Sequence, residues 1–428
     1  MPSYADVFRM KGYPALFFAA AVSTWGDYIA RLTIAAVVYE RTQSPLATAS
    51  TLAVSMLPTI FGRSLLGPFA DRVPYKYVLL GAHLTRAACV VGLIALVSSG
   101  APVAALLVML FVLETFGGPA VAANQVLMTD LFENRRLYVK AMGLTALSEQ
   151  INQAAGLAVG GLIVGFLGPT KGLVVDLASF LVSATVVAVV LRARPVRGVP
   201  TRGLVGFFRD IGTGGAYIRR HRVLARLLAL SLAAAVGIAA PEAAAIPYAG
   251  SARLGGLLMA APIAGAAVGV IIVSRWVPDV ANSRIIRMAL LMPVPLFFTA
   301  FQPPTVVTWL LWFLSGSLQA FMLPLQATFS LVTPAQRRGT IFGLAGAVSV
   351  TASGVSYLLA GFLSEVTTPA AAVTMSAVMC FGAIVLMAAT WPRRALERAV
   401  ETAYASERSP GEHALGERTP GEGTRGRF

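Results

Sequence analysis

Four ionisable side chains lie deep inside long apolar stretches of this sequence: Asp27, Arg31, Glu114 and Glu149. A charged group at the middle of an apolar, membrane-spanning helix costs about 2.5–3.5 kcal/mol, so each of the four needs a partner or a function. A carboxylate buried in this way can bind and release a proton. An arginine one helical turn away can instead neutralise it. These residues could therefore take part in proton exchange or in ion pairing.

Two interpretations stay open for most of these side chains. Asp27 and Glu114 are both candidates for proton binding. The alternative for Asp27 is a permanent ion pair with Arg31. Glu149, which has amide side chains around it, is a coupling residue or a polar contact between helices. Arg86 can neutralise one of the acids. The nearby His83 is a packing residue or a proton relay.

Long apolar segments must position these side chains. The chain has 428 residues, of which 57% are hydrophobic and 12% charged, and its mean hydropathy is +0.74. A bilayer core about 30 Å thick is crossed by about 20 apolar residues in a helix, and backbone groups in lipid must find partners within their own segment. The sequence therefore predicts an all-α integral membrane protein that crosses a cell (inner or plasma) membrane several times.

We predict twelve transmembrane helices in two six-helix halves, separated by Pro- and Gly-containing turns. The N-terminal half, 1–191, has spans near 14–38, 46–69, 77–97, 102–124, 139–164 and 172–191. The C-terminal half, 223–391, has spans near 223–248, 254–276, 285–301, 305–327, 340–363 and 370–391. Between them we expect a basic cytoplasmic linker, 192–222, with a short interfacial helix. Residues 392–428 are expected to be a disordered cytoplasmic tail.

Basic residues alternate from loop to loop and predict the orientation. If both termini are cytoplasmic, only Arg41, Lys171 and Arg253 fall on the opposite side, which agrees with the excess of Lys and Arg in cytoplasmic loops. The net charge of +15 is spread over these loops rather than along one face, so topology explains it better than nucleic-acid binding does. The expected partners are the lipid bilayer and a small-molecule substrate, and we expect a monomer.

The sequence offers no support for an enzyme. It has no phosphate-binding loop, no zinc-type His and Glu motif and no serine hydrolase elbow, and it contains three histidines. Cys89 and Cys380 both fall inside predicted spans, which argues against a disulfide framework or a metal site. We therefore expect neither a metal nor a cofactor.

A charged turn follows the second predicted span, with Gly67, Asp71, Arg72 and Lys76 in that order. It resembles the loop between the second and third helices of the major facilitator superfamily, a class of secondary transporters. The resemblance implies a cytoplasmic gate in which Asp71 contacts the start of the eleventh helix, near 339–340. Pro74 and its neighbour Tyr75 depart from the family pattern.

Further segments extend this resemblance to the macrolide efflux and enterobactin exporter branch of drug–proton antiporters. They are residues 25–27, 119–131, 160–161 and 179–180. Gly156, Gly160 and Gly161 resemble the antiporter motif of the fifth helix, with Leu157 in place of its proline. The resemblance also implies that helices one and four line a central cavity, which favours Asp27 and Glu114 as proton-binding residues.

The second half shows a different pattern, because its acids Glu242, Asp279 and Glu365 fall near predicted helix ends. An aromatic and amide set in helix ten is either a substrate wall or a surface that faces lipid and neighbouring helices; its members are Trp309, Trp312, Gln319, Phe321, Met322 and Gln326. We interpret the chain as a proton-coupled exporter of a small amphipathic or hydrophobic compound, a drug or secondary metabolite, working by alternating access. A proton-coupled importer or uniporter of a polar metabolite, and a transporter-like membrane sensor, are the alternatives.

Overall fold

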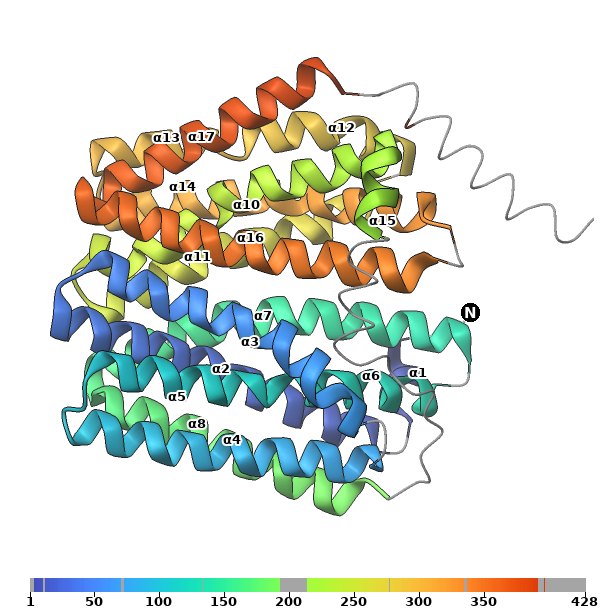
Figure 1. Ribbon diagram of the computed structural model, residues 1–428, viewed down its shortest axis with the longest axis vertical. Helices are drawn as coiled ribbons and strands as arrows, with labels where there is room; N and C mark the ends of the chain where they lie inside the picture. Colours follow the sequence, from blue (N-terminus) through green and yellow to red (C-terminus); the bar gives the residue numbers. More distant parts are fainter. Residues whose placement is uncertain are drawn as a thin grey trace, which may run out of the picture.

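The computed structural model describes residues 4–10, 12–70, 73–132, 134–192, 214–276, 278–334, 337–391 and 396. Regular structure in this part of the chain is helical throughout (Figure 1). The predicted interfacial helix of the linker, the gate residues Asp71 and Arg72, and nearly all of the predicted tail lie outside the described residues.

The helices form two groups (Figure 1). The first helix group comprises α1 (Tyr4–Phe8), α2 (Tyr13–Thr42), α3 (Pro45–Ala70), α4 (Tyr75–Ser98), α5 (Val103–Thr115), α6 (Gly117–Leu131), α7 (Arg135–Leu167) and α8 (Pro169–Val190). The second comprises α10 (Arg222–Ala249), α11 (Ala252–Val273), α12 (Pro278–Leu291), α13 (Val294–Phe297), η1 (Phe298–Phe301), α14 (Thr305–Leu318), η2 (Gln319–Phe321), α15 (Met322–Val332), α16 (Arg338–Val366) and α17 (Pro369–Ala389).

Each of the twelve predicted spans falls on one of these helices or on consecutive helices of one run. Among the described residues, ten helices are long and apolar enough to cross a membrane. The other two candidates, α2 and α3, are 30 and 26 residues long and pack within the bundle, but they are not among those ten. An all-helical membrane protein is thus the observed class, while the count of twelve spans stays a prediction.

Local sequence explains the tight turns between neighbouring helices. Gly250 ends α10 with φ of 65°, a left-handed conformation that glycine adopts at little cost, and the next residue, Ser251, caps α11 by accepting a hydrogen bond from the Leu254 amide. Pro169 starts α8 at the first helical turn, where a missing amide hydrogen costs nothing. Helices joined by such turns therefore run antiparallel. We call the end of the bundle where residues 192 and 214 lie the linker end, and the other the opposite end.

Packing differs between the two ends. Towards the opposite end, one apolar cluster draws members from both groups, among them Leu32, Leu157, Ala243 and Met259; we call it the shared core. Towards the linker end, the described residues form separate clusters within each group. The groups meet chiefly through α11 against α7 and α16 against α3. Among the described residues, the groups are therefore joined chiefly towards the opposite end.

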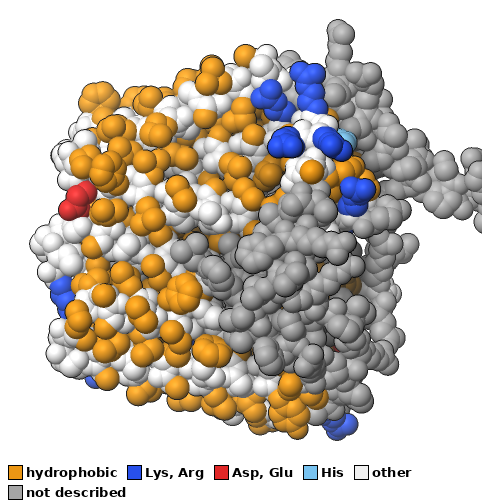
Figure 2. Space-filling view, viewed as in Figure 1, with side chains coloured by type: hydrophobic (Ala, Val, Ile, Leu, Met, Phe, Trp, Pro, Cys, Tyr) orange, Lys and Arg blue, Asp and Glu red, His pale blue; other side chains and the backbone are white. Residues whose placement is uncertain are grey.

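The outer surface is largely apolar between its two ends. Figure 2 shows hydrophobic side chains spread over the visible face, with Lys and Arg gathered near its margins. Phe18, Val189, Phe301 and Leu386 are 62–79% exposed, which a membrane-spanning surface tolerates. The described basic residues of the linker end include Arg9, Lys76, Lys140, Arg192, Arg219, Arg220, Arg222, Arg275, Arg284, Arg287, Arg337 and Arg338, whereas those of the opposite end are Arg41, Lys171 and Arg253.

Candidate functional site

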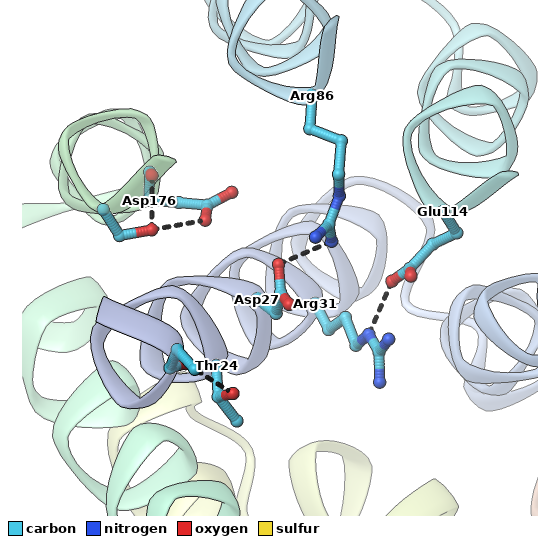
Figure 3. A network of polar contacts seen from close by, with 8 residues as sticks. Thr24, Asp27, Arg31, Arg86, Glu114 and Asp176 are labelled. Atoms are coloured by element: carbon cyan, nitrogen blue, oxygen red, sulfur yellow. Dashed lines mark hydrogen bonds and ion pairs between the residues drawn. The ribbon is translucent and has the colours of Figure 1, made fainter. Parts of the chain in front are cut away.

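Two ion pairs connect the middle of α2 to its neighbours (Figure 3). Arg86 of α4 donates from a terminal nitrogen to Asp27 Oδ1 at 2.6 Å. Arg31 donates from Nε to Glu114 Oε1 of α5, also at 2.6 Å. Helical periodicity places Asp27 and Arg31 one turn apart on α2, so one face of this helix presents both charges to α4 and α5. We call these four residues and Asp176 the charge centre.

The alternative in which Asp27 pairs with Arg31 is wrong for this structure. Each of the two finds its ion-pair partner on another helix, although helical spacing would permit a pair within α2. Arg86, which we predicted to neutralise one of the acids, forms its ion pair with Asp27. The α2 side chains retain some exposure, 20% for Asp27 and 17% for Arg31, whereas Glu114 and Arg86 are almost fully enclosed.

Packing fixes the Arg86 side chain as firmly as its ion pair does. The guanidinium carbon lies 4.4 Å from the centre of the Phe180 ring on α8, a cation–π contact. The Nε of Arg86 is buried without a hydrogen-bond partner. Glu114 lies next to the end of α5, and Gly117 begins α6 shortly after it. A Cβ on Gly117 would lie 3.9 Å from the guanidinium carbon of Arg86.

Asp176 joins the charge centre, and the sequence interpretation missed it. Its side chain is fully buried on α8. Oδ1 accepts a hydrogen bond of 3.4 Å from Ser179, whereas Oδ2 has no partner. A Cβ on Gly26 would lie 2.5 Å from Asp176 Oδ1, so the acid is held against the α2 backbone beside Asp27. Its place inside the predicted span 172–191 was the signal that could have revealed it.

Glu242, which we expected near a helix end, lies in the last third of α10. Its Oε2 accepts a hydrogen bond of 2.6 Å from the Tyr357 hydroxyl of α16. It also interacts electrostatically with Arg31 and with Tyr28, both from α2 of the first group. What the sequence interpretation missed is that Glu242 lies on a helix that approaches α2 of the first group.

Glu149 and His83 are not connected to the charge centre by hydrogen bonds. Glu149 is exposed on α7, and neither the ion pairs nor the hydrogen bonds of the described residues include it, so it is not the satisfied interhelical contact of one interpretation. That role falls to Asn152, whose Oδ1 accepts from the Trp25 indole at 2.8 Å. His83 Nδ1 is buried without a partner and its ring lies 6.1 Å from that of Phe180.

The antiporter-like glycines are points of close helix approach. A Cβ on Gly156 would lie 3.1 Å from that of Tyr28, and one on Gly160 would lie 3.2 Å from Ile29 Cα, both on α2. Gly161 faces the other group, because its Cβ would lie 2.9 Å from the Ala252 carbonyl and 3.0 Å from Gly256 Cα. The motif thus joins α7 to α2 and to α11.

The gate motif is described only in part. Gly67 falls within α3, and Asp71 and Arg72 lie outside the described residues. Lys76, at the start of α4, donates to the Ala188 carbonyl of α8 at 2.8 Å, which is a contact within the first group. The predicted gate therefore stays a prediction.

The aromatic and amide set of predicted helix ten is divided between packing and exposed positions. Trp312 is fully buried and its indole donates to Thr299 at 3.1 Å, while Phe321 is fully buried in the second group's own cluster; in this structure both are packing residues rather than cavity residues. Trp309 stacks on Phe313 with ring centres 5.2 Å apart. Of the remaining members, Gln319 and Met322 are half-buried and Gln326 is exposed.

Within the described part of the chain, no three His, Cys, Asp or Glu side chains are arranged to hold a metal ion. Asp27 and Glu114 of the charge centre pair with arginines instead, and such an arrangement can exchange protons or ion-pair partners. Two groups of apolar helices that pack against each other, with buried ion pairs inside the first group, fit the architecture of a secondary transporter.

A family model confirms this class. The model described as Major Facilitator Superfamily matches residues 16–329, so the chain belongs to that superfamily. It is 25% identical over 230 residues to YkuC and 23% identical over 225 residues to YvqJ, two uncharacterized MFS-type transporters of Bacillus subtilis (strain 168). These matches span 52% and 51% of this chain, and 53% of each relative, about half the length of either protein.

Solved structures agree on the fold. The nucleoside transporter NupG superposes with a TM-score of 0.67 at 12% identity, covering 88% of this chain and 98% of that one. A bacterial homologue of the human lysosomal transporter Spinster gives a TM-score of 0.61 at 15% identity, covering 91% and 97%. At such low identity the likeness establishes the fold alone.

Proposed function

We propose that this transporter couples the export of a small amphipathic or hydrophobic compound to proton movement, by alternating access in a cell membrane. The observation that carries the proposal is the charge balance of the first helix group. Its centre holds three carboxylates, Asp27, Glu114 and Asp176, but two guanidiniums, Arg31 and Arg86. With every group ionised, the centre would carry one uncompensated negative charge.

An uncompensated charge in a buried site costs several kcal/mol, because nearby polar groups replace the lost water only in part. A bound proton removes this cost without any new contact. Asp176 Oδ2, which is buried and has no partner, is the simplest place for that proton, and Asp27 lies beside it. The partial exposure of Asp27 offers a path by which a proton can enter from the region between the groups.

The packing of the two groups supports alternating access. The shared core closes the opposite end, and separate clusters leave the groups free to move apart or together at the linker end. Since basic residues mark the cytoplasmic side, the linker end and both termini are assigned to the cytoplasm. In this state the region between the groups would accept a compound from inside the cell.

Export is favoured over import by the antiporter-like glycines and by the resemblance to drug–proton antiporters. Glycines at 156, 160 and 161 let α7 approach both α2 and α11, so a change in one contact is transmitted to the other. The gate residues Gly67, Asp71, Arg72 and Lys76 would hold the linker end together in the outward-open state.

The decisive experiment is flux in proteoliposomes with an imposed pH gradient, over a panel of lipophilic compounds and polar metabolites. We expect Asp27→Asn, Glu114→Gln and Asp176→Asn to abolish the stimulation by the gradient. Glu40→Gln, which alters an exposed carboxylate of the same α2 helix, is the matched control and should transport as wild type. Flux that ignores the gradient in wild type would identify a uniporter and overturn the proposal.

A further inference from the structure

Charge accounting over the described residues leaves three buried or half-buried acids of the bundle without a cationic partner in contact: Asp130, near the linker end of α6, and Asp176 and Glu242, deeper in the bundle. Arg86 and Arg31 are committed to Asp27 and Glu114. Asp176 is fully buried, so a ligand cannot reach it. Glu242 is only partly buried, and its one hydrogen bond comes from a neutral hydroxyl, that of Tyr357. Of the two unpaired acids deep in the bundle, Glu242 is therefore the one that a ligand can reach.

The surroundings of Glu242 come from both helix groups. Tyr357 reaches it from α16 of its own group, at 2.6 Å. Arg31 and Tyr28 lie within electrostatic reach on α2 of the first group, without an ion pair being formed with Glu242. The guanidinium of Arg31 lies 5.2 Å from the centre of the Tyr28 ring. A carboxylate and two phenol rings thus converge where the groups face each other.

Depth places this cluster next to the closed end of the bundle. Glu242 lies in the last third of α10, and both Ala243 and Tyr357 belong to the shared core. A ligand that entered from the linker end would meet the cluster just before the shared core stops it. Contacts to α10 and α16 on one side and to α2 on the other would also let the ligand bias the relative position of the groups.

We propose that Glu242, Tyr357 and Tyr28 bind the positively charged group of an organic cation, such as an ammonium carried on an apolar body. The carboxylate supplies a charge-assisted contact, and the half-buried Tyr28 ring supplies cation–π surface. The largely buried Tyr357 holds the carboxylate in place through its hydroxyl. Arg31 stays neutralised by Glu114, but its nearby positive charge limits the site to a single cationic group. This inference rests on the proposed transport function and adds the substrate class to it.

Equilibrium binding to the purified full-length protein tests the site directly. The probes are two cation–neutral pairs of similar shape: benzyltrimethylammonium with neopentylbenzene, and tetraphenylphosphonium with tetraphenylsilane. We expect wild type to bind each cation about tenfold more tightly than its neutral counterpart, as charge-assisted contacts usually provide. Glu242→Gln should weaken cation binding about tenfold and change neutral binding less than about twofold.

Two further variants separate recognition from folding. Glu242→Asp keeps the charge and should retain the preference for cations, and Tyr357→Phe should weaken cation binding by about two- to fivefold. Glu40→Gln should bind as wild type. Unchanged binding of the neutral probes and an unchanged thermal unfolding curve establish that each variant is folded. The proposal is overturned if wild type binds neither cation, if it binds the neutral probes equally well, or if Glu242→Gln keeps the preference.

Binding and flux fail independently, so the two proposals can be distinguished. The binding measurement uses no membrane and no pH gradient, and a cation preference lost in Glu242→Gln supports the site even where flux ignores the gradient. Gradient-driven flux of the two cations that is unaffected by Glu242→Gln would instead support proton-coupled export and overturn the cation site.

Discussion

The two helix groups share an architecture but treat ionisable side chains differently. The first group holds Asp27, Glu114 and Asp176 against two arginines in its interior. In the described part of the second group, the interior acid is Glu242, and its partner is the hydroxyl of Tyr357. The first group therefore neutralises its interior acids mainly with arginines, whereas the described part of the second group holds one carboxylate that has no arginine partner and is surrounded by apolar side chains.

This difference separates two tasks that a coupled transporter must perform. Ion pairs that exchange partners can follow the binding of a proton, because each arginine is strongly held only while its acid is ionised. A lone carboxylate among phenol rings suits recognition, since its charge is available to a ligand. Coupling then requires contact between the groups, and the proximity of Arg31 to Glu242 provides it.

The largest expected effect comes from breaking an ion pair of the first group. Arg86→Gln leaves Asp27 without its cation in a buried site, which should destabilise the fold by about 3–5 kcal/mol, measured by thermal unfolding in detergent. Adding Asp27→Asn removes the stranded charge and should recover most of the loss. If the double variant is as unstable as the single one, the charge pairing is not what the first group depends on.

Smaller but still large effects are expected where the groups touch. A Cβ on Gly256 would lie 2.6 Å from the Leu157 carbonyl, so Gly256→Ala should destabilise the protein by about 1–3 kcal/mol and reduce flux. Gly143→Ala on α7 meets open space and should be neutral or stabilising by up to about 1 kcal/mol. Equal free energies of unfolding for the two variants would contradict the close contact between α11 and α7 at Gly256.

The apolar interior of the second group predicts a moderate effect. Trp312→Phe leaves the buried Thr299 hydroxyl without its donor and opens a small cavity where the second ring packed, at a cost of at least about 1–2 kcal/mol. Trp309→Phe, at a stacked and half-buried position, should cost less. Both are read from thermal unfolding. A larger loss for Trp309→Phe would mean that stacking, rather than the buried hydrogen bond, holds this region.

The smallest effect is expected at the exposed contact between the groups. Glu365 accepts hydrogen bonds from Ser44 at 2.8 Å and from the Leu46 amide at 3.2 Å, so it joins α16 to the start of α3. Glu365→Gln should cost about 0.5–1 kcal/mol in thermal unfolding, because water competes for exposed partners. A cost of several kcal/mol would show that this contact, and not the shared core, closes the opposite end.

Much of the charge centre was visible in the sequence. Asp27, Arg31, Glu114 and Arg86 stood out because a charge inside an apolar span is costly wherever it occurs. Their pairing was not visible, since helical spacing allowed Asp27 to meet Arg31 and carried no information on α4 or α5. Asp176 was missed within an apolar span, and Glu242 was discounted because its position was judged from the end of a span.

The sequence alone determined the class of the molecule, its apolar segments and the depth of most charges along them, because hydropathy and turn residues act locally along the chain. The tertiary structure decided which acid meets which arginine, that the groups close at one end, and that Glu242 faces α2. Those outcomes depend on how each helix is rotated and where it lies in the bundle. Both are set by packing among helices that are distant in sequence.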